Sequence, residues 1–299
     1  MHYIKRYNLW RPENLLRYST TYLSYTVFLP LTFHLKFVIT GVPKSGTTWL
    51  GKIFASMPKV YMQFEGSLSS YARRLQEEVL RNPGYDLHDA GTYSDLRIFK
   101  QLIVKRAYLS RKTLMGYKAP SLLPEPLKHF FPNARVAFIY RDGRDFIVSD
   151  AFHNIRKGRI QGDPSTEEFW EEAIMRRALF WKDKVMNVLP RFRSIYGDDL
   201  YEIRYEDLVK PEKGLQIIQE LAGFFGLNPE YATRAWEANR FDKLSGGRDP
   251  GQEDRKSFFR KGISGDWQNY FTVKNMETFN NLAGDALSVL GYNGIRTAG

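Results

Sequence analysis

The segment between Phe37 and Met57 restricts the fold more than any other part of the sequence. The β-branched run Phe37-Val38-Ile39-Thr40 precedes a loop that begins at Gly41 and ends at Gly46, and residues 47–57 then have a helical pattern. In a strand–loop–helix unit, the loop N–H groups and the helix N-terminus together form an anion site. We therefore expect an α/β protein with an anion-binding loop at the carboxyl end of a strand.

The alternation of strands and helices continues along the chain. Further strands are predicted at residues 60–64, 114–117, 135–140 and 200–205. Helices are predicted at residues 68–81, 93–109, 166–189, 211–225 and 274–290, and another leads from the strand at 135–140 to about Ile155. Strands separated by helices favour a parallel sheet flanked by helices, with ligands at the carboxyl ends of the strands.

The length of 299 residues fits one α/β domain, which we place at residues 35–299. An aromatic-rich N-terminal arm, residues 1–34, precedes it, and this arm is a candidate for contact with an apolar acceptor or a membrane surface. Its apolar stretch at residues 22–33 is shorter than the roughly 20 residues that span a bilayer. Residues 244–265 are rich in Gly, Arg, Asp and Ser and are predicted to form a long, mobile loop.

Charge and cysteine content narrow the chemistry. The chain has 44 Lys and Arg residues against 33 Asp and Glu residues, a net charge of +11, which indicates an anionic ligand. The basic residues are spread along the sequence, which does not favour a nucleic-acid partner. The chain has no cysteine, so disulfides, cysteine-ligated metals and thiol nucleophiles are excluded. We expect a cytoplasmic protein.

The glycine loop differs from that of ATPases and kinases. Gly41 and Gly46 have the spacing of the pattern G-x-x-x-x-G-K-[ST], but Thr47 stands at the lysine position and Lys44 lies inside the loop. A phosphotransferase also needs a carboxylate that holds Mg²⁺, and no strand end offers an evident one. The loop therefore suits a nucleotide with a shorter anionic tail and no obligatory metal.

Three segments resemble the sulfotransferases that use 3′-phosphoadenosine 5′-phosphosulfate (PAPS). They are Pro43-Lys44-Ser45-Gly46-Thr47-Thr48-Trp49, the segment from Tyr140 to Ser149, and the segment from Arg260 to Thr272, in the family's order. The resemblance covers residues 37–277. It implies a P-loop-like nucleotide-binding fold and in-line transfer of a sulfuryl group to an acceptor hydroxyl or amine, with release of adenosine 3′,5′-bisphosphate and without a metal.

The resemblance also implies roles for individual residues. The 5′-phosphate and sulfate would be held by Lys44, Ser45, Gly46, Thr47 and Thr48, and Lys44 would neutralise charge on the bridging oxygen. The adenine would lie near Trp49, Tyr205 and Phe241. The 3′-phosphate would be bound by Arg141, Ser149 and the triplet Arg260-Lys261-Gly262, which we expect to be loose until a ligand orders it.

The general base is not evident from the sequence. Cytosolic members of the family have a Lys-Thr-His segment where this chain has Lys118-Ala119-Pro120, so Lys118 resembles the sulfate-contacting lysine but the histidine is missing. Glu65, which follows the strand at 60–64, is the first candidate base. His153, one helical turn beyond Ser149, is the second, and His88 could arrive on a substrate loop.

The acceptor, the assembly and two rival functions stay open. The missing histidine favours a carbohydrate, lipid or small-molecule acceptor over a simple phenol. Gln268 replaces the lysine of the family's dimer motif, K-x-x-x-T-V-x-x-x-E, so the sequence does not fix an oligomeric state. A P-loop phosphotransferase would require Mg²⁺, and a non-enzymatic polyanion or nucleic-acid binder would show a steep dependence on salt.

Overall fold

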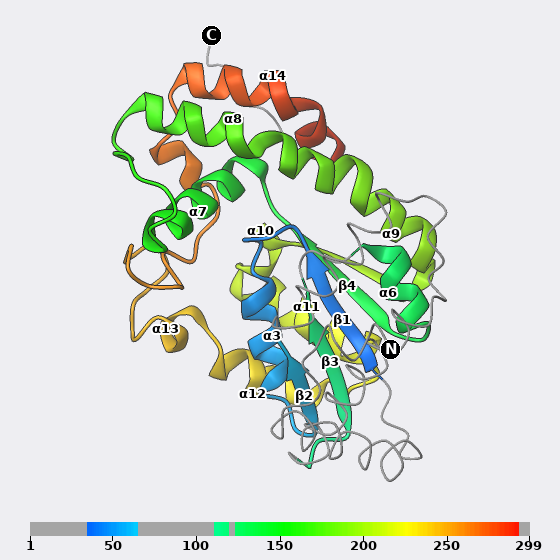
Figure 1. Cartoon of the computed structure of the whole chain (residues 1–299). Helices are drawn as coiled ribbons and strands as arrows, with labels where there is room; N and C mark the ends of the chain where they lie inside the picture. The colour runs from blue at the N-terminus through cyan, green and yellow to red at the C-terminus, as the bar shows by residue number, and fades with distance from the viewer. Residues whose placement is uncertain (1–34, 65–110, 120–122, 293–299) are drawn as a thin grey trace, which may run out of the picture.

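A five-stranded parallel sheet forms the centre of the protein. The structure, a computed structural model, describes residues 35–64, 111–119 and 123–292. The strands are β1 (Leu35–Gly41), β2 (Val60–Gln63), β3 (Leu114–Lys118), β4 (Arg135–Tyr140) and β5 (Leu200–Arg204). Their order is β2-β3-β1-β4-β5, and every neighbouring pair is parallel (Figure 1). The predicted α/β class is therefore confirmed.

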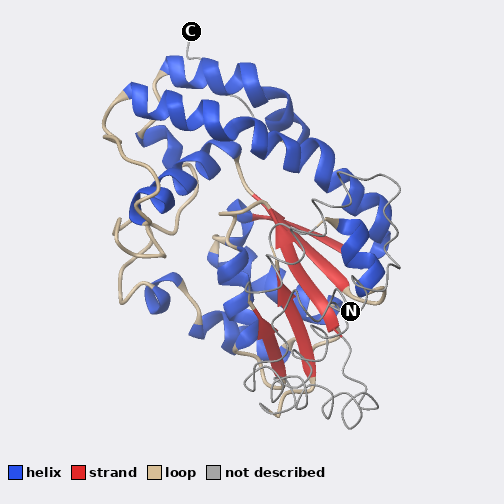
Figure 2. Cartoon of the chain, viewed as in Figure 1, coloured by secondary structure: helices blue, strands red, loops and turns tan. Residues whose placement is uncertain are grey.

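Helices cover both faces of this sheet (Figure 2). Val38 and Phe138 point to the face covered by α7 (Gly143–Arg156), α8 (Glu167–Asp183), α9 (Leu189–Tyr196) and α14 (Val273–Val289). Phe37 and Ile39 point to the opposite face, covered by α3 (Thr47–Ala55), α11 (Pro211–Phe224) and α12 (Glu230–Ala238). Since both faces are buried, the strands are apolar without alternation.

Shorter elements complete the described part of the chain. They are α6 (Pro124–Phe130), α10 (Tyr205–Leu208), α13 (Phe241–Leu244) and the 3₁₀ turns Gly197–Asp199 and Asp266–Asn269. The sequence analysis did not anticipate α6, α12 or α13, each of which has nine residues or fewer. The helices predicted at 68–81 and 93–109 and the arm at 1–34 lie outside the described residues. No helix in the described ranges is long and apolar enough to cross a bilayer.

The helix predicted to end at Leu189 does not end there. A π-helical turn at Lys184–Val188 joins α8 to α9, and the helical path continues to Tyr196. The prediction stopped at Pro190 because proline interrupts helix interiors. In the structure Pro190 lies in the first turn of α9, where proline is tolerated, and the wider π turn before it accommodates the change of hydrogen-bond pattern.

The order of the strands fixes the position of the site. β1 is the central strand, with β3 on one side and β4 on the other. The helix that follows β1, α3, covers one face of the sheet, whereas the helix that follows β4, α7, covers the other. The chain therefore diverges at the carboxyl ends of these two strands, which is where open α/β sheets bind ligands.

Substitution of Gly116, in the middle of β3, tests how tightly the side chains on the sheet are packed. A Cβ atom at this position would overlap the Met62 sulfur and the Phe37 ring. We expect Gly116→Ala to reduce the free energy of unfolding by about 1–3 kcal/mol, measured by urea denaturation, because a filled core cannot absorb an added methyl group. Gly284→Ala, in α14, is the matched control. Its Cβ would meet nothing closer than 3.5 Å, so the free energy of unfolding should stay unchanged or rise by about 0.5–1 kcal/mol.

Candidate active site

The phosphate loop, residues 41–48, presents an open helix N-terminus. Gly46 is the N-cap of α3 and has a φ of 89°, a left-handed conformation that suits glycine. No side chain caps α3 and no acidic residue lies in its first turn. By contrast, Asp142, Thr166 and Thr272 accept hydrogen bonds from the first turns of α7, α8 and α14. The α3 amides are therefore left for an external anion.

A cavity of about 460 Å³ brings together most of the residues predicted from the sequence. Those that line it are Lys44, Gly46, Thr47, Thr48, Trp49, Lys118, Arg141, Ser149, His153, Tyr205, Phe241, Arg260, Lys261 and Gly262. Ser45 is the exception. Its side chain is buried, and its hydroxyl has no hydrogen-bond partner among the described residues. Glu65 and His88 lie outside the described residues.

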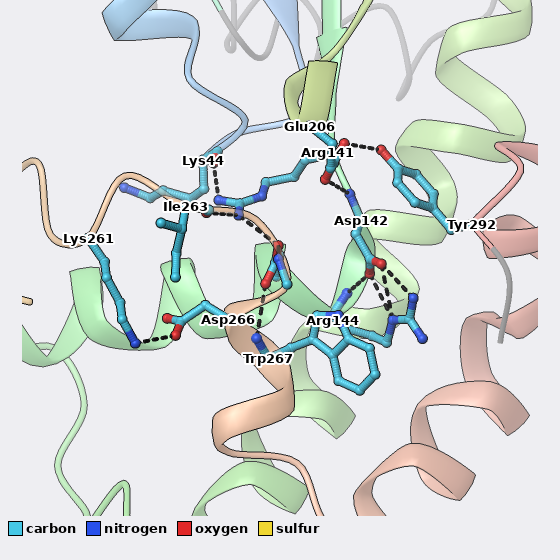
Figure 3. A network of polar contacts seen from close by, with 12 residues as sticks. Lys44, Arg141, Asp142, Arg144, Glu206, Lys261, Ile263, Asp266, Trp267 and Tyr292 are labelled. Carbon is cyan, nitrogen blue, oxygen red and sulfur yellow. Dashed lines mark hydrogen bonds and ion pairs between the residues drawn. The ribbon is translucent and has the colours of Figure 1, made fainter. Parts of the chain in front are cut away.

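An ion pair between Arg141 and Asp145 joins three of these segments. Figure 3 shows the Arg141 side chain beside Lys44 and Ile263. The Arg141 Nη2 atom lies 3.0 Å from the Asp145 Oδ2 atom, and both side chains are buried. Arg141 also donates to the backbone carbonyl oxygens of Lys44 and Ile263, at 3.2 and 3.5 Å. Burial alone would lower the pKa of Arg141, but the charge of Asp145 raises it, so the guanidinium stays charged.

Asp145 extends this connection to the C-terminal segment. Its two carboxylate oxygens accept hydrogen bonds from the backbone N–H groups of Gly265 and Trp267, at 2.7 and 3.0 Å. The phosphate loop, the end of β4 and the segment after the Arg260-Lys261-Gly262 triplet are thus held by one pair of charges. The sequence analysis did not identify Asp145 as a functional residue, although it lies inside the Tyr140–Ser149 segment.

A second carboxylate fixes the start of α7. Glu206 accepts hydrogen bonds from the Asp142 N–H at 3.0 Å and from the Tyr292 hydroxyl at 2.7 Å. Asp142 in turn caps α7 and accepts from the Arg144 guanidinium. The Asp142 carboxylate, which follows β4, therefore stabilises the start of α7. No three His, Asp or Glu side chains in the described ranges are grouped as metal ligands.

The Arg260-Lys261-Gly262 triplet is held by carboxylates. Asp266 pairs with Arg260 and accepts from Lys261 at 2.6 Å, and Glu253 also pairs with Arg260. Burial alone would raise the pKa of Asp266, but the Lys261 hydrogen bond and the Arg260 charge hold it below its usual value. Gly262 has a φ of 68°, and a Cβ there would overlap the Phe241 ring. These contacts do not support the expectation of a loose triplet.

Arg248 holds the predicted loop at residues 244–265. Its guanidinium donates to the backbone carbonyl oxygens of Gln252, Phe259 and Arg260 at 2.6–2.8 Å, and to that of Ser245 at 3.2 Å. It also lies 5.6 Å from the centre of the Phe241 ring. The sequence analysis missed this residue, because nothing in its local sequence marks an arginine that binds backbone carbonyls.

Lys118, the last residue of β3, is buried, and Lys44, in the phosphate loop, is half-buried. The pKa of Lys44 is lowered to about 8, mainly by burial, with Asp150 opposing the shift and Arg156, Arg159 and Arg177 adding to it. The pKa of Lys118 is also lowered to about 8, by burial and by the charge of Lys44. An anion bound between the two ammonium groups would favour their charged forms.

His153 lies in the cavity but is poorly arranged to act as a base. Its Nδ1 atom is 3.2 Å from the Nη2 atom of Arg156. Arginine can only donate, so Nδ1 accepts this bond and the neutral ring carries its proton on Nε2. Burial and the charge of Lys44 lower the pKa of His153 to about 4. The ring is therefore neutral near pH 7 and offers a hydrogen-bond donor.

Aromatic side chains line the cavity near the N-terminus of α3. The Trp49 indole N–H donates to the carbonyl oxygen of Asn239 at 2.7 Å, and its ring centre lies 5.3 Å from that of Trp236. The Tyr205 ring lies 4.3 Å from the Arg141 guanidinium. Together with Phe241, these rings form an apolar wall beside the phosphate loop that suits a planar base.

The lowered lysine pKa values predict a pH-dependent anion affinity. Sulfate does not titrate near neutral pH, whereas Lys44 and Lys118 lose charge above about pH 8 in the empty protein. We expect the affinity for inorganic sulfate, measured by calorimetry, to be constant up to about pH 8. It should then fall by up to about tenfold per pH unit for each titrating lysine. Lys118→Arg, which stays charged, should have a shallower slope. An affinity that does not change between pH 7 and 9.5 would contradict this assignment.

The hydrogen bonds of Arg248 to backbone carbonyl groups lead to a prediction about nucleotide binding. We expect Arg248→Ala to weaken binding of adenosine 3′,5′-bisphosphate about tenfold, because the triplet loses the bonds that position it. Amide hydrogen exchange over residues 249–261 should also become faster. Arg234→Ala, which removes an exposed arginine of α12, is the control and should change neither measurement. Unchanged binding in Arg248→Ala would mean that these hydrogen bonds do not position the triplet.

Comparison with known proteins agrees with this geometry. The sulfotransferase domain family matches residues 35–291. Sulfotransferase 1A1 of Bos taurus is 25% identical over 254 residues, covering 81% of this chain and 80% of the relative. Sulfotransferase 2A1 of Homo sapiens is 24% identical over 264 residues, covering 82% and 81%. The structure of mouse sulfotransferase SULT7A1 complexed with PAP has a TM-score of 0.53 at 19% identity and covers 84% of this chain and 83% of that one.

The fold comparison includes a bacterial protein as well. A sulfotransferase from Alicyclobacillus acidocaldarius has a TM-score of 0.51 at 15% identity, covering 86% of this chain and 94% of that chain. The family match includes all five strands, the phosphate loop and the Arg260-Lys261-Gly262 triplet. The chain therefore belongs to the sulfotransferase domain family and is a sulfotransferase.

Proposed function

We propose that this sulfotransferase uses PAPS and transfers its sulfuryl group to a hydroxyl group of a small-molecule, lipid or carbohydrate acceptor. The observation that supports this most strongly is the shared cavity of the phosphate loop and the Arg260-Lys261-Gly262 triplet. The phosphate loop contributes the uncapped α3 N-terminus and Lys44, β3 contributes Lys118, and Arg141, Ser149 and the triplet also line the cavity. Cationic groups from separate segments beside an aromatic wall fit a nucleotide with anionic groups on both its 5′ and 3′ sides.

The donors in the cavity fit this nucleotide. The lining residues with a positive charge are Lys44, Lys118, Arg141, Arg156, Arg240, Arg255, Arg260 and Lys261, and the lining carboxylates are Asp242 and Asp249. Lys44, Thr47, Thr48 and the α3 amides would hold the phosphosulfate. Arg141, Ser149, Lys261 and the Gly262 backbone would hold the 3′-phosphate, and Trp49, Tyr205 and Phe241 would contact the adenine.

The residues of the chain would act mainly through charge and position. In the transfer, the acceptor oxygen bonds to sulfur as the bond between sulfur and the bridging oxygen breaks, and the acceptor proton leaves to a base. Lys44 would stabilise negative charge on the bridging oxygen, and Lys118 would stabilise charge on the sulfuryl oxygens. The base stays a prediction. Glu65 is its first candidate, since the hydrogen bond from Arg156 occupies the basic nitrogen of His153.

The compartment and the acceptor class are also proposals. We propose a cytoplasmic location, supported by the similarity to cytosolic sulfotransferase 1 of Danio rerio, which is 26% identical over 266 residues. A small-molecule acceptor is supported by relatives such as flavonol 3-sulfotransferase of Flaveria bidentis. Peripheral membrane contact through residues 1–34 and the absence of a metal requirement stay predictions.

The 3′-phosphate preference tests this function directly. In calorimetric titrations with EDTA, we expect adenosine 3′,5′-bisphosphate to bind about 100-fold more tightly than 5′-AMP, because the 3′-phosphate makes several charge-assisted hydrogen bonds. Lys261→Gln should weaken the bisphosphate about tenfold and leave 5′-AMP nearly unchanged. Lys256→Gln, at an exposed lysine outside the cavity, is the matched control and should leave both affinities unchanged.

A protein that bound both nucleotides equally would contradict the use of PAPS. Binding that required Mg²⁺ and favoured ATP would instead support a phosphotransferase. Thermal unfolding of each variant distinguishes lost binding from lost folding. Arg141 is less suitable for this test, because its contacts to Asp145, Lys44 and Ile263 also hold the protein together.

A further inference from the structure

The C-terminal half of α7 forms part of the cavity wall. Ser149, His153 and Arg156 follow one another at intervals of four and three residues and all line the cavity. Ser149 belongs to the proposed 3′-phosphate site. His153 and Arg156 belong neither to the phosphate loop nor to the Arg260-Lys261-Gly262 triplet. His153 and Arg156 are therefore polar side chains of the cavity to which the proposed nucleotide contacts assign no role.

Arg156 differs from the other arginines that line the cavity. Arg141 pairs with Asp145, Arg240 with Asp242, Arg255 with Glu253, and Arg260 with Asp266. Arg156 has no carboxylate partner within the described part of the chain. Its Nη2 atom donates to His153, and its guanidinium lies 5.6 Å from the centre of the Phe258 ring. The neighbouring carboxylate of Asp150 pairs with Arg177 at 3.1 Å and accepts from Asn154 at 3.0 Å.

His153 adds a second donor beside Arg156. Because its Nδ1 atom accepts from Arg156, the Nε2 atom of the neutral ring carries the proton. The pair therefore offers donors to the cavity. A lone guanidinium in a partly enclosed site binds an anion more strongly than a surface arginine does, since less solvent screens the charge. Within the described ranges, a neutral acceptor would leave that charge without a counter-ion.

The pair lines the same cavity as Lys44 and Lys118. Burial and the charge of Lys44 lower the pKa of His153, and the charge of Arg156 adds to the lowering of the Lys44 pKa by burial, so these groups are near enough to affect one another. Lys44 marks the position of the bond that breaks in the proposed reaction. The acceptor must reach this point with its hydroxyl group, so a group bound by Arg156 would belong to the acceptor.

We propose that the acceptor carries an anionic group, a carboxylate, sulfate or phosphate ester, next to the hydroxyl that is sulfated, and that Arg156 and His153 bind this group. The proposal rests on the proposed function, since it assigns the substrate class of the same site. It makes Arg156 a residue that determines specificity and His153 a substrate-binding donor.

Matched probes test this in protein saturated with adenosine 3′,5′-bisphosphate. Calorimetry compares 4-nitrophenyl β-D-glucuronide and 4-nitrophenyl β-D-glucoside 6-phosphate with neutral 4-nitrophenyl β-D-glucoside, and 4-hydroxyphenylacetate with its neutral amide. In the unaltered protein we expect the anionic probe of at least one set to bind about tenfold more tightly or better. The two glucoside derivatives distinguish a carboxylate from a phosphate. The same probes then serve as acceptors with PAPS, where kcat/KM should show the same preference.

Two variants locate the preference. Arg156→Gln should reduce the ratio of anionic to neutral affinity to within about twofold, whereas Arg156→Lys should retain part of it. Arg159→Gln is the matched control, because it removes one positive charge from an exposed arginine three residues further on that does not line the cavity. It should leave the ratio unchanged. All three variants should bind adenosine 3′,5′-bisphosphate within about twofold of the unaltered protein.

Three results would overturn the proposal. One is that no anionic probe binds more tightly than its neutral partner, which includes the case in which none of the anionic probes binds. Another is an anionic preference that Arg156→Gln leaves intact. The third is a loss of about tenfold in bisphosphate affinity in Arg156→Gln, which would assign Arg156 to the nucleotide. Failure of the proposed function is recognised separately, as the lack of a 3′-phosphate preference in the unaltered protein.

Discussion

The ion pair between Arg141 and Asp145 is the contact on which the site depends. Arg141 follows β4, donates to the phosphate loop at Lys44 and reaches Ile263 beside the Arg260-Lys261-Gly262 triplet. Asp145 completes the connection through the amides of Gly265 and Trp267. Segments 97 to 122 residues apart in the sequence are thus set at fixed distances from one another. A buried pair is well suited to this role, because removing either partner leaves a charge in a poorly solvated place.

The central sheet and most of the site could be predicted because their signals are local. Gly41, Gly46 and Lys44 lie within one turn, and the strands are short apolar runs. The contacts that organise the site are not local. Arg248 binds carbonyl groups up to twelve residues away, and Glu206 joins Asp142 to Tyr292. Such partners have no periodic pattern, so only the folded chain identifies them. The same holds for Arg156, which has no carboxylate partner among the described residues because of where its neighbours lie.

The cavity concentrates positive charge at a cost to the empty protein. Burial lowers the pKa of both Lys44 and Lys118, which means that their charged forms are less stable there than in water. An anion that binds between them removes this penalty. The unfavourable burial of these two charges and the affinity of the site for an anion therefore have the same origin, and the scaffold of β1, β3 and β4 keeps the two lysines together.

The carboxylates at the triplet have a consequence for turnover. Asp266 and Glu253 pair with Arg260 and Lys261. A phosphate that arrives there meets cations with existing partners, so part of its interaction with them replaces contacts that the carboxylates make. When the spent nucleotide leaves, the same carboxylates are at hand to take its place. An internal counter-ion of this kind limits product retention and so favours repeated catalytic cycles.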